Sequence, residues 1–316
     1  MPDFPALIGQ PQAVELLTRA VRQDRIAPAY LFVGAPGVGR SLAARYFAGL
    51  LLSPEPQAEV STALRQRIEQ GNHPDLFWVE PTYLHQGKRY SAAEAAEMGL
   101  KRKSPPEIRL EQVREVARFL SRPPLEAVRS VVVLEEADTM AESAANGLLK
   151  TLEEPGNATL ILIAPSPESL LPTLVSRCQR IPFRRLDTGA IAQVLQQANQ
   201  SEILQHPEVL ALAQGSPGAA IDHWQQLQAM PPELLEQVKQ LPRSLRQALE
   251  LARQIAQALD TEAQLWLLDY LQQHYWETLR QPQILQTLET ARRNLLQYVQ
   301  PRLVWEVTLM GFLPLG

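Results

Sequence analysis

The first half of the chain alternates short apolar runs with stretches that place apolar residues at helical spacing. The runs are rich in aromatic or β-branched residues, which is typical of buried strands; they cover residues 30–33, 76–79, 130–134 and 159–164. Helices are expected around them, at residues 14–21, 42–52, 110–120 and 141–152. Because strands that alternate with helices form a covered parallel sheet, this half predicts an α/β fold.

Beyond Phe183 the pattern becomes helical throughout. No β-branched run of strand length appears there, and Gln, Leu, Ala and Arg dominate. The stretch 215–218 opens a short helix, and Pro231-Pro232 is typical of a linker. We therefore expect three domains, namely an α/β domain at residues 1–185, a small helical domain at 186–231 and a larger helical domain at 232–316.

Residues 83–106 form an insertion that the pattern predicts to be a loop. The insertion carries the basic run Lys101-Arg102-Lys103, which could contact DNA phosphates. A charge run in a loop is more often a solvated surface, and we favour that interpretation.

The composition limits what the protein can be. A chain of 316 residues is long enough for about two or three domains. Its 30 Lys and Arg residues against 34 Asp and Glu residues give a net charge of −4, which argues against a basic surface for unspecific nucleic-acid binding. The lone Cys178 excludes an internal disulfide and a cysteine-rich zinc module. No secretory leader is recognised and no apolar stretch reaches the ~18 residues of a membrane helix, so a cytoplasmic protein is expected.

Residues 34–41 match the phosphate-loop pattern between an expected strand and an expected helix. The glycines let the backbone curl so that its amides face a phosphate, and the serine hydroxyl can ligate magnesium. The candidate nucleotide-binding residues are Gly34, Gly37, Gly39, Arg40 and Ser41. Arg40 stands where lysine is usual, and its wide guanidinium leaves two interpretations open. The loop binds ATP or ADP, or it is a glycine-rich turn whose pocket Arg40 fills itself.

A pair of acidic residues follows the apolar run at 130–134. A phosphate-loop ATPase would place Asp and then Glu here, whereas this chain has Glu135 and Glu136. The longer Glu135 side chain shifts the carboxylate that would hold a magnesium-bound water. Together with Arg40 it predicts little or no hydrolysis, and the pair is either a degenerate metal site or a solvated strand end.

An ordered set of motifs resembles the subunits of bacterial clamp loaders, which are AAA+ proteins. The motifs are Leu7-Ile8-Gly9-Gln10, Ala29-Tyr30-Leu31-Phe32, Asn146-Gly147-Leu148-Leu149-Lys150-Thr151-Leu152-Glu153-Glu154-Pro155 and Ser176-Arg177-Cys178. Residues 71–75 and 106–114 resemble the delta-prime subunits of DNA polymerase III in particular. The resemblance covers residues 4 to about 220, and the rest of the chain shares only helical character with the family.

The resemblance implies an AAA+ module with a five-stranded parallel sheet, a helical lid at 186–231 and a helical collar at 232–316 that joins a pentameric ring. The implied partners are motor subunits of the gamma or tau type and the delta subunit, with primed DNA and the sliding clamp reached through the complex and no membrane involved. It also implies that Arg177 reaches in trans into a neighbouring subunit's nucleotide site as an arginine finger. Without the resemblance, Arg177 would be interpreted as a surface residue that caps a short helix at 172–176.

Several departures from the motor subunits point to a chain that does not turn over nucleotide. Arg40 replaces their lysine, Ala164 stands where they have a polar phosphate sensor, and no arginine follows the stretch at 215–218. Residues 53–71 contain no cysteine, so the family's zinc module is missing and no metal is expected. We therefore expect a scaffold and arginine-finger donor that requires no cofactor. Two alternatives stay open, an active AAA+ ATPase motor subunit and a stand-alone nucleotide-binding regulator.

Three other features are interpreted structurally. His73 has no second histidine at ligand spacing, which favours a structural role in its loop. Cys178 is expected to be a small buried side chain and not a reactive thiol. The aromatic residues of the C-terminal helices are expected in the core or at a subunit interface in preference to a base-stacking face, and we favour the interface; they are Trp266, Tyr270, Tyr275, Trp276, Tyr298 and Trp305.

Overall fold

The chain divides into two compact units, Met1–Ala190 and Ile191–Gly316. The computed structural model describes residues 7–54, 60–99 and 105–313. The first boundary lies within a few residues of the one expected at 185. The helices after residue 190 group into one unit, so the further division at residue 231 stays a prediction.

The first unit is built on a five-stranded sheet with the order β2-β5-β6-β1-β7, and all neighbouring strands run parallel. The strands are β1 (Ala29–Val33), β2 (Leu76–Val79), β5 (Ser130–Leu134), β6 (Ala158–Ala164) and β7 (Gln179–Pro182). Every residue of β5 and β6 is buried, which explains their unbroken apolar runs. The α/β prediction and its expected strands are confirmed.

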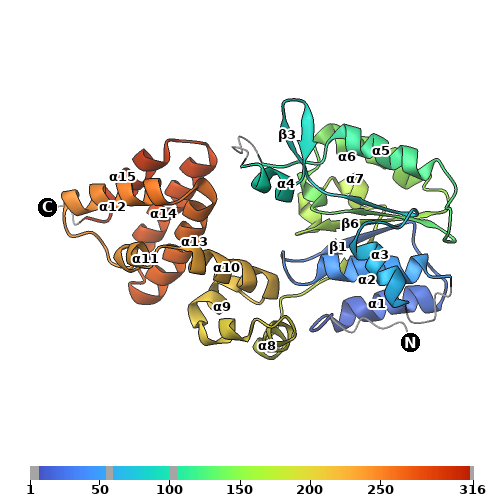
Figure 1. The fold of residues 1–316 in the computed structure, drawn as a ribbon, viewed down its shortest axis with the longest axis horizontal. Coiled ribbons are helices and arrows are strands. Elements are labelled where there is room, and N and C mark those ends of the chain that lie inside the picture. The colour runs from blue at the N-terminus through green and yellow to red at the C-terminus, as the bar shows by residue number, and fades with distance from the viewer. Residues whose placement is uncertain (1–6, 55–59, 100–104, 314–316) are drawn as a thin grey trace. The chain divides into compact units, whose positions relative to one another are not determined.

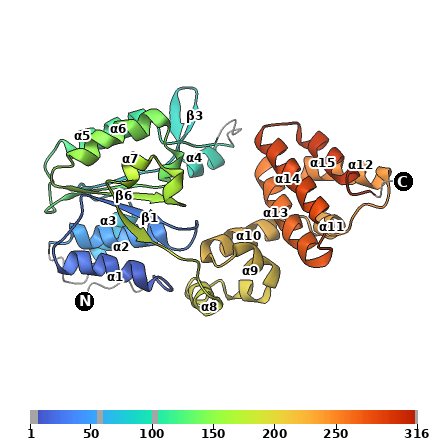
Figure 2. The ribbon, with the colours of Figure 1, turned by 180° about the vertical axis from the view of Figure 1, so that it is seen from behind.

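Helices cover both faces of this sheet (Figures 1 and 2). One face carries α5, α6 and α7, and the other carries α1, α2 and α3. Their bounds are α1 Pro11–Arg22, α2 Arg40–Leu52, α3 Thr62–Glu69, α5 Leu110–Leu120, α6 Glu142–Glu153 and α7 Pro172–Val175. Alternate side chains of β1 serve the two faces, because Leu31 packs with the α5 and α6 core whereas the rings of Tyr30 and Phe32 lie 5.0 Å and 6.4 Å from that of Phe47.

The prediction of a loop at residues 83–106 is wrong for the first part of that segment. Tyr83–His85 (β3) and Lys88–Tyr90 (β4) form an antiparallel hairpin, and Ala92–Glu97 forms helix α4. Gln86 and Gly87 join the two strands with φ of 49° and 78°, and this left-handed pair suits a tight hairpin turn. The basic run at 101–103 lies outside the described residues.

The motif at residues 71–75 ties the start of β2 to a distant loop. The Asp75 carboxylate accepts hydrogen bonds from the backbone N–H groups of Leu125, Glu126 and Ala127 at 2.6, 2.8 and 2.7 Å. Burial alone would raise the pKa of Asp75, but the three N–H groups outweigh it and hold the pKa below its usual value. The buried His73 accepts a hydrogen bond of 3.2 Å from the Asp75 N–H at Nδ1, which agrees with its expected structural role.

The second unit contains only helices and turns in its described residues 191–313. Helix α8 (Thr188–Gln197) leads into it, followed by α9 Pro207–Ala213, α10 Pro217–Ala229, α11 Pro232–Val238, α12 Leu245–Ala258, α13 Thr261–Thr278, α14 Pro282–Leu296 and α15 Pro301–Met310. The helical C-terminal region is therefore confirmed. In the parts of the chain that the structure describes, no helix is long and apolar enough to cross a membrane.

Four of the six C-terminal aromatic residues belong to the core of their own unit, which corrects the interface expected for them. Trp266, Tyr270, Tyr275 and Trp305 are buried within the cluster formed by α11 to α15. Buried polar atoms are paired there, since Trp305 Nε1 donates to Gln264 Oε1 at 2.9 Å and the Tyr275 hydroxyl donates to the Val238 carbonyl at 2.6 Å. Only Trp276 and Tyr298 are exposed among the six.

Candidate functional site

The glycine-rich loop connects the carboxyl end of β1 to the first residue of α2. Gly37 and Gly39 have φ of 74° and 101°, a region that favours glycine. A Cβ atom at Gly34 would lie only 2.5 Å from the Phe183 carbonyl oxygen. The backbone path of the predicted phosphate loop therefore requires these glycines.

Arg40 is the first residue of α2, and only 8% of its surface is exposed. Its Nη1 atom is buried and has no hydrogen-bond partner in the described part of the chain. Burial lowers the pKa of Arg40, and the negative charges of Glu135, Asp138 and Glu136 oppose this shift. The guanidinium is thus desolvated and balanced by acidic groups, which is costly for a cation whose donors are incompletely paired.

Ser41 and Glu135 bring the phosphate loop and the acidic motif together. The Ser41 hydroxyl donates a hydrogen bond to Glu135 Oε1, from the residue that directly follows β5. Burial raises the pKa of Glu135, whereas the Ser41 hydrogen bond and the Arg40 charge lower it. The sequence-predicted residues Arg40, Ser41 and Glu135 are therefore neighbours.

Glu136 differs from Glu135 in its surroundings. It is exposed, its φ is 46°, and it precedes a short helical turn at Ala137–Thr139. Although the residue as a whole is exposed, partial desolvation of its carboxyl group raises its pKa, and the nearby charge of Asp138 adds to the shift. Of the predicted acidic pair, Glu135 alone bonds the serine.

The residue types around the loop fit a phosphate group. The glycines can present backbone amides, and the Ser41 hydroxyl and Glu135 carboxylate carry the oxygen ligands that Mg²⁺ prefers. These two groups bond each other, however, and Arg40 is buried against the acids. Ala164 ends β6 beside the loop, and its carbonyl accepts a 3.4 Å hydrogen bond from the Gly34 N–H. The residue at this position therefore has no polar side chain that could contact a phosphate.

Arg177 lies in the turn between α7 and β7 and stays accessible. Its Nη2 donates to Glu153 Oε1 at 2.7 Å, and its Nη1 donates to the Thr173 carbonyl of α7 at 3.0 Å. The second bond is the helix-capping contact expected for a surface arginine. The adjacent Cys178 is partly buried against the core, and burial raises the pKa of its thiol to about 11, as expected for a structural cysteine.

The candidate arginine finger and the phosphate loop lie at opposite ends of the parallel strands. Strands β1 and β7 are parallel, with Tyr30 paired to Gln179 and Val33 paired to Pro182. Arg177 precedes β7 and therefore lies at the amino end of the strands, whereas the loop follows the carboxyl end of β1. A strand of this length spans about 16 Å at ~3.3 Å per residue. Arg177 is therefore separated from its own chain's loop by the length of the strands.

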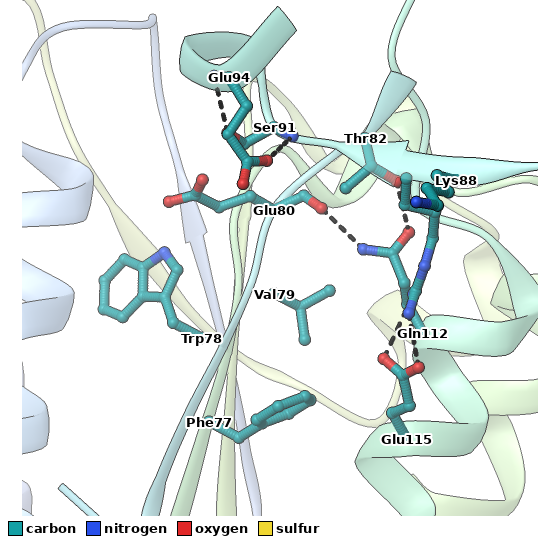
Figure 3. A pocket seen from close by; sticks show the side chains of 11 residues that line it. Phe77, Trp78, Val79, Glu80, Thr82, Lys88, Ser91, Glu94, Gln112 and Glu115 are labelled. Carbon is teal, nitrogen blue, oxygen red and sulfur yellow. Dashed lines mark hydrogen bonds and ion pairs between the residues drawn. The ribbon is translucent and has the colours of Figure 1, made fainter. Parts of the chain in front are cut away.

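A cavity of about 540 Å³ at the outer side of β2 was not anticipated from the sequence (Figure 3). Its polar lining is largely paired within itself, since Gln112 Nε2 donates to the Glu80 carbonyl at 2.8 Å and Glu115 forms a 2.6 Å ion pair with Arg89. Trp78 lies at the wall, and the Arg45 guanidinium stacks 4.5 Å from the centre of its ring. The hairpin that borders the cavity was the feature that the sequence interpretation missed.

No group of three or more His, Cys, Asp or Glu side chains with suitable placement occurs in residues 7–54, 60–99 and 105–313. The expectation that this chain carries no zinc stays a prediction.

Comparisons with known proteins agree over most of the chain. Residues 9–187 match the family model described as DNA polymerase III, delta subunit, and residues 189–312 match the model described as the C-terminal domain of cyanobacterial DNA polymerase III delta prime. The DNA polymerase III subunit delta' of Bacillus subtilis is 36% identical over 185 residues, which are 58% of this chain and 50% of that protein. The subunit delta' of Pseudomonas aeruginosa is 35% identical over 221 residues, or 68% of this chain and 61% of that protein.

These matches span about half to three fifths of the length of the two relatives. The DNA polymerase III subunit tau/gamma of Haemophilus influenzae is 28% identical over 229 residues, 69% of this chain and 29% of that protein. Among solved structures, a gamma subunit-related protein from Thermotoga maritima aligns with a TM-score of 0.56 and 15% identity over 95% of this chain and 98% of that chain. At that identity the likeness supports the fold alone.

Proposed function

Because the chain belongs to the delta-prime family of DNA polymerase III, we propose that it is a clamp-loader subunit that acts as a scaffold and donates Arg177 to the nucleotide site of a neighbouring subunit. Its partners would be motor subunits of the gamma or tau type and a delta subunit in a pentameric ring. The ring would place the sliding clamp on primed DNA in the cytoplasm. The observation that carries the proposal is the exposed Arg177 at the sheet edge opposite to its own phosphate loop.

An arginine supplied in trans stabilises the charge of a transferring phosphoryl group, with effects of roughly 10³ to 10⁵ on rate in well-studied cases. Arg177 has the properties that this role needs. Its guanidinium is accessible, it is fixed by contacts to Glu153 and Thr173, and strand geometry keeps it away from its own loop. A neighbouring chain is therefore the natural recipient.

The chain itself would hydrolyse little or no ATP. Support comes from the buried guanidinium of Arg40, from the hydrogen bond that engages both Ser41 and Glu135, and from Ala164 at the sensor position. If a nucleotide binds, the loop glycines and Ser41 would hold its phosphates, and the magnesium that accompanies it would supply positive charge near Glu135. Such a nucleotide would serve as a structural ligand.

The role of the C-terminal helices in assembly is supported by exposed apolar side chains. Leu245 and Leu249 on α12 are exposed, as are Leu303 and Val307 on α15, and these two helices pack against each other. Side chains of this kind are costly in water when they gather on one surface and are commonly covered by a partner subunit. We therefore propose that the ring contact lies on the α12 and α15 faces.

The proposal is tested by measuring DNA-stimulated ATP turnover of the purified chain alone and then with its cognate motor and delta subunits, while assembly is followed by size. We expect no turnover alone and a gain in the mixture that Arg177→Ala abolishes. An unchanged rate with Arg177→Ala removes the finger role. Turnover alone that is lost with Ser41→Ala identifies an active ATPase instead, and a chain that stays monomeric and stimulates no partner is a separate nucleotide-binding regulator.

A further inference from the structure

The Arg177 guanidinium is held from two sides by groups on different elements. Glu153, the last residue of α6, accepts a 2.7 Å hydrogen bond from Nη2, and the Thr173 carbonyl of α7 accepts a 3.0 Å hydrogen bond from Nη1. Glu153 and Arg177 are 24 positions apart along the chain. The contact thus joins the end of one helix to the turn that follows another.

We propose that Glu153 is a positioning residue for Arg177, an inference that rests on the finger role proposed above. Glu153 and the Thr173 carbonyl together select the guanidinium orientation that meets a phosphate of the neighbouring subunit's nucleotide. Glu153 does not itself touch the nucleotide. It acts through the arginine.

Selection of one orientation matters because an arginine side chain is long and flexible. An unrestrained guanidinium samples many rotamers, and each contact with a partner must first restrict them. A displacement of about 1 Å in a positioned group can cost ~10² in rate. A guanidinium carries more N–H groups than these two contacts use, so donors remain for a phosphate.

The elements that carry Glu153 and Arg177 are anchored in the core by buried side chains. Leu148 and Leu152 of α6 are buried in the core of the first unit, and so are Leu174 and Val175 of α7. On β7, the strand that follows Arg177, Ile181 is fully buried. Both partners therefore project from well-packed elements, as a precise site requires.

The ion pair between Arg177 and Glu153 is not expected to stabilise the fold. The side chains of Arg177 and Glu153 are 38% and 53% exposed. Ion pairs at such exposed positions contribute little to folding. Loss of the Glu153 carboxylate should consequently leave the fold intact, so that an effect on a partner's turnover can be measured without unfolding.

The neighbouring Glu154 supplies a matched control. It is exposed and follows Glu153 directly, and it is not one of the two groups that accept hydrogen bonds from the Arg177 guanidinium. Glu154→Gln changes the net charge in the same way as Glu153→Gln. It leaves the Arg177 contact in place.

The experiment compares full-length variants in the reconstituted complex with motor and delta subunits, with ATP turnover measured at varied ATP concentration. We expect Glu153→Gln to lower kcat about three- to tenfold with an unchanged KM. Glu153→Asp keeps a carboxylate and should have a kcat between those of Glu153→Gln and the wild-type chain. Glu154→Gln should match the wild-type chain. On an Arg177→Ala background, Glu153→Gln should have no further effect, because its action passes through the arginine.

Four results overturn the inference. They are an unchanged or raised kcat with Glu153→Gln, an equal effect of Glu154→Gln, a further loss on the Arg177→Ala background, and a failure of Glu153→Gln to assemble, which would assign Glu153 to the interface itself. Failure of the proposed function is distinguishable, because Arg177→Ala would then leave turnover unchanged.

Discussion

The Ser41 hydroxyl donates a hydrogen bond to the Glu135 carboxylate, which joins the first turn of α2 to the residue after β5. These are the two oxygen-bearing groups that a magnesium ion would need, and in this structure each is the other's partner. Burial raises the pKa of Glu135, and the serine hydroxyl counters that shift. The hydrogen bond therefore stabilises the charged form of the partly buried carboxylate.

Ser41→Ala should lower the free energy of unfolding by about 1 kcal/mol, because it removes this hydrogen bond and leaves the carboxylate less compensated. Partner turnover in the reconstituted complex should stay unchanged, since the proposed function gives the loop of this chain no part in hydrolysis. Urea unfolding and ATP turnover check the two parts. Ser41→Thr keeps the hydroxyl and is the control, and a loss of turnover in the mixture would contradict the silent loop.

Asp75→Asn should destabilise the first unit by about 2–3 kcal/mol at pH 7, because the carboxylate accepts three backbone hydrogen bonds. The folded pKa of Asp75 is depressed, so its contribution is present above the ordinary value of about 3.9 and is lost as the pH falls through the lower folded value. The difference between the urea midpoints of wild type and variant should therefore be largest at pH 7 and should shrink as the pH is lowered below about 3.9.

Glu126→Gln is the control for Asp75. The carboxylate of Glu126 forms an ion pair with the exposed side chain of Arg67, at 2.8 Å. A loss as large as that of Asp75→Asn would show that the local loop, and not the buried carboxylate, carries the stability.

His223 should make the second unit less stable in mild acid. Its Nδ1 accepts a 3.1 Å hydrogen bond from Trp266 Nε1, which requires the neutral ring, and burial lowers its pKa. Its stabilising effect is complete above the ordinary histidine pKa of about 6.5 and is lost as the pH falls from there through the lower folded value. Tryptophan fluorescence during urea unfolding at pH 7.5 and pH 5.5 measures the loss.

His223→Gln should flatten this pH dependence, because an amide does not titrate in that range. His85→Gln, on the exposed strand β3, should leave it as in the wild type. A pH dependence that survives His223→Gln would assign the effect to another group.

Gly34→Ala should destabilise the first unit by about 2 kcal/mol or more, because the added Cβ would lie 2.5 Å from the Phe183 carbonyl oxygen. Gly156→Ala is a matched comparison. Its φ is 61° but open space surrounds it, so only backbone strain of about 1 kcal/mol is expected. Thermal unfolding of both variants decides, and equal losses would contradict a steric role for Gly34.

Val307→Asp should weaken assembly with the partner subunits at least tenfold while the isolated chain keeps its fold, since this side chain is 58% exposed. Sedimentation of the mixture measures assembly. Gln286→Asp, an exposed change on α14, is the control. Normal assembly of Val307→Asp would move the contact away from α15.

Buried parallel strands were predictable from the sequence because burial on both faces writes a continuous apolar run, as at residues 130–134 and 159–164. The hairpin at Tyr83–Tyr90 was missed for the opposite reason. Its strands have three residues each and are mostly exposed, so no apolar pattern marks them.

Contacts between distant segments were also beyond the sequence. The loop glycines, Arg40, Ser41 and Glu135 could be chosen by motif, but the burial of Arg40 depends on how α2 and β5 meet. The partner of Arg177 likewise comes from another helix. The aromatic residues of the C-terminal helices were misplaced because helical spacing marks an apolar face without saying whether the same chain covers it.

The two edges of the central sheet can change independently. A substitution in the loop after β1 alters groups that Arg177 does not contact, and a change at Glu153 or Arg177 leaves the loop as it was. The arginine at position 40, where phosphate loops usually have lysine, is therefore compatible with an intact set of contacts around Arg177.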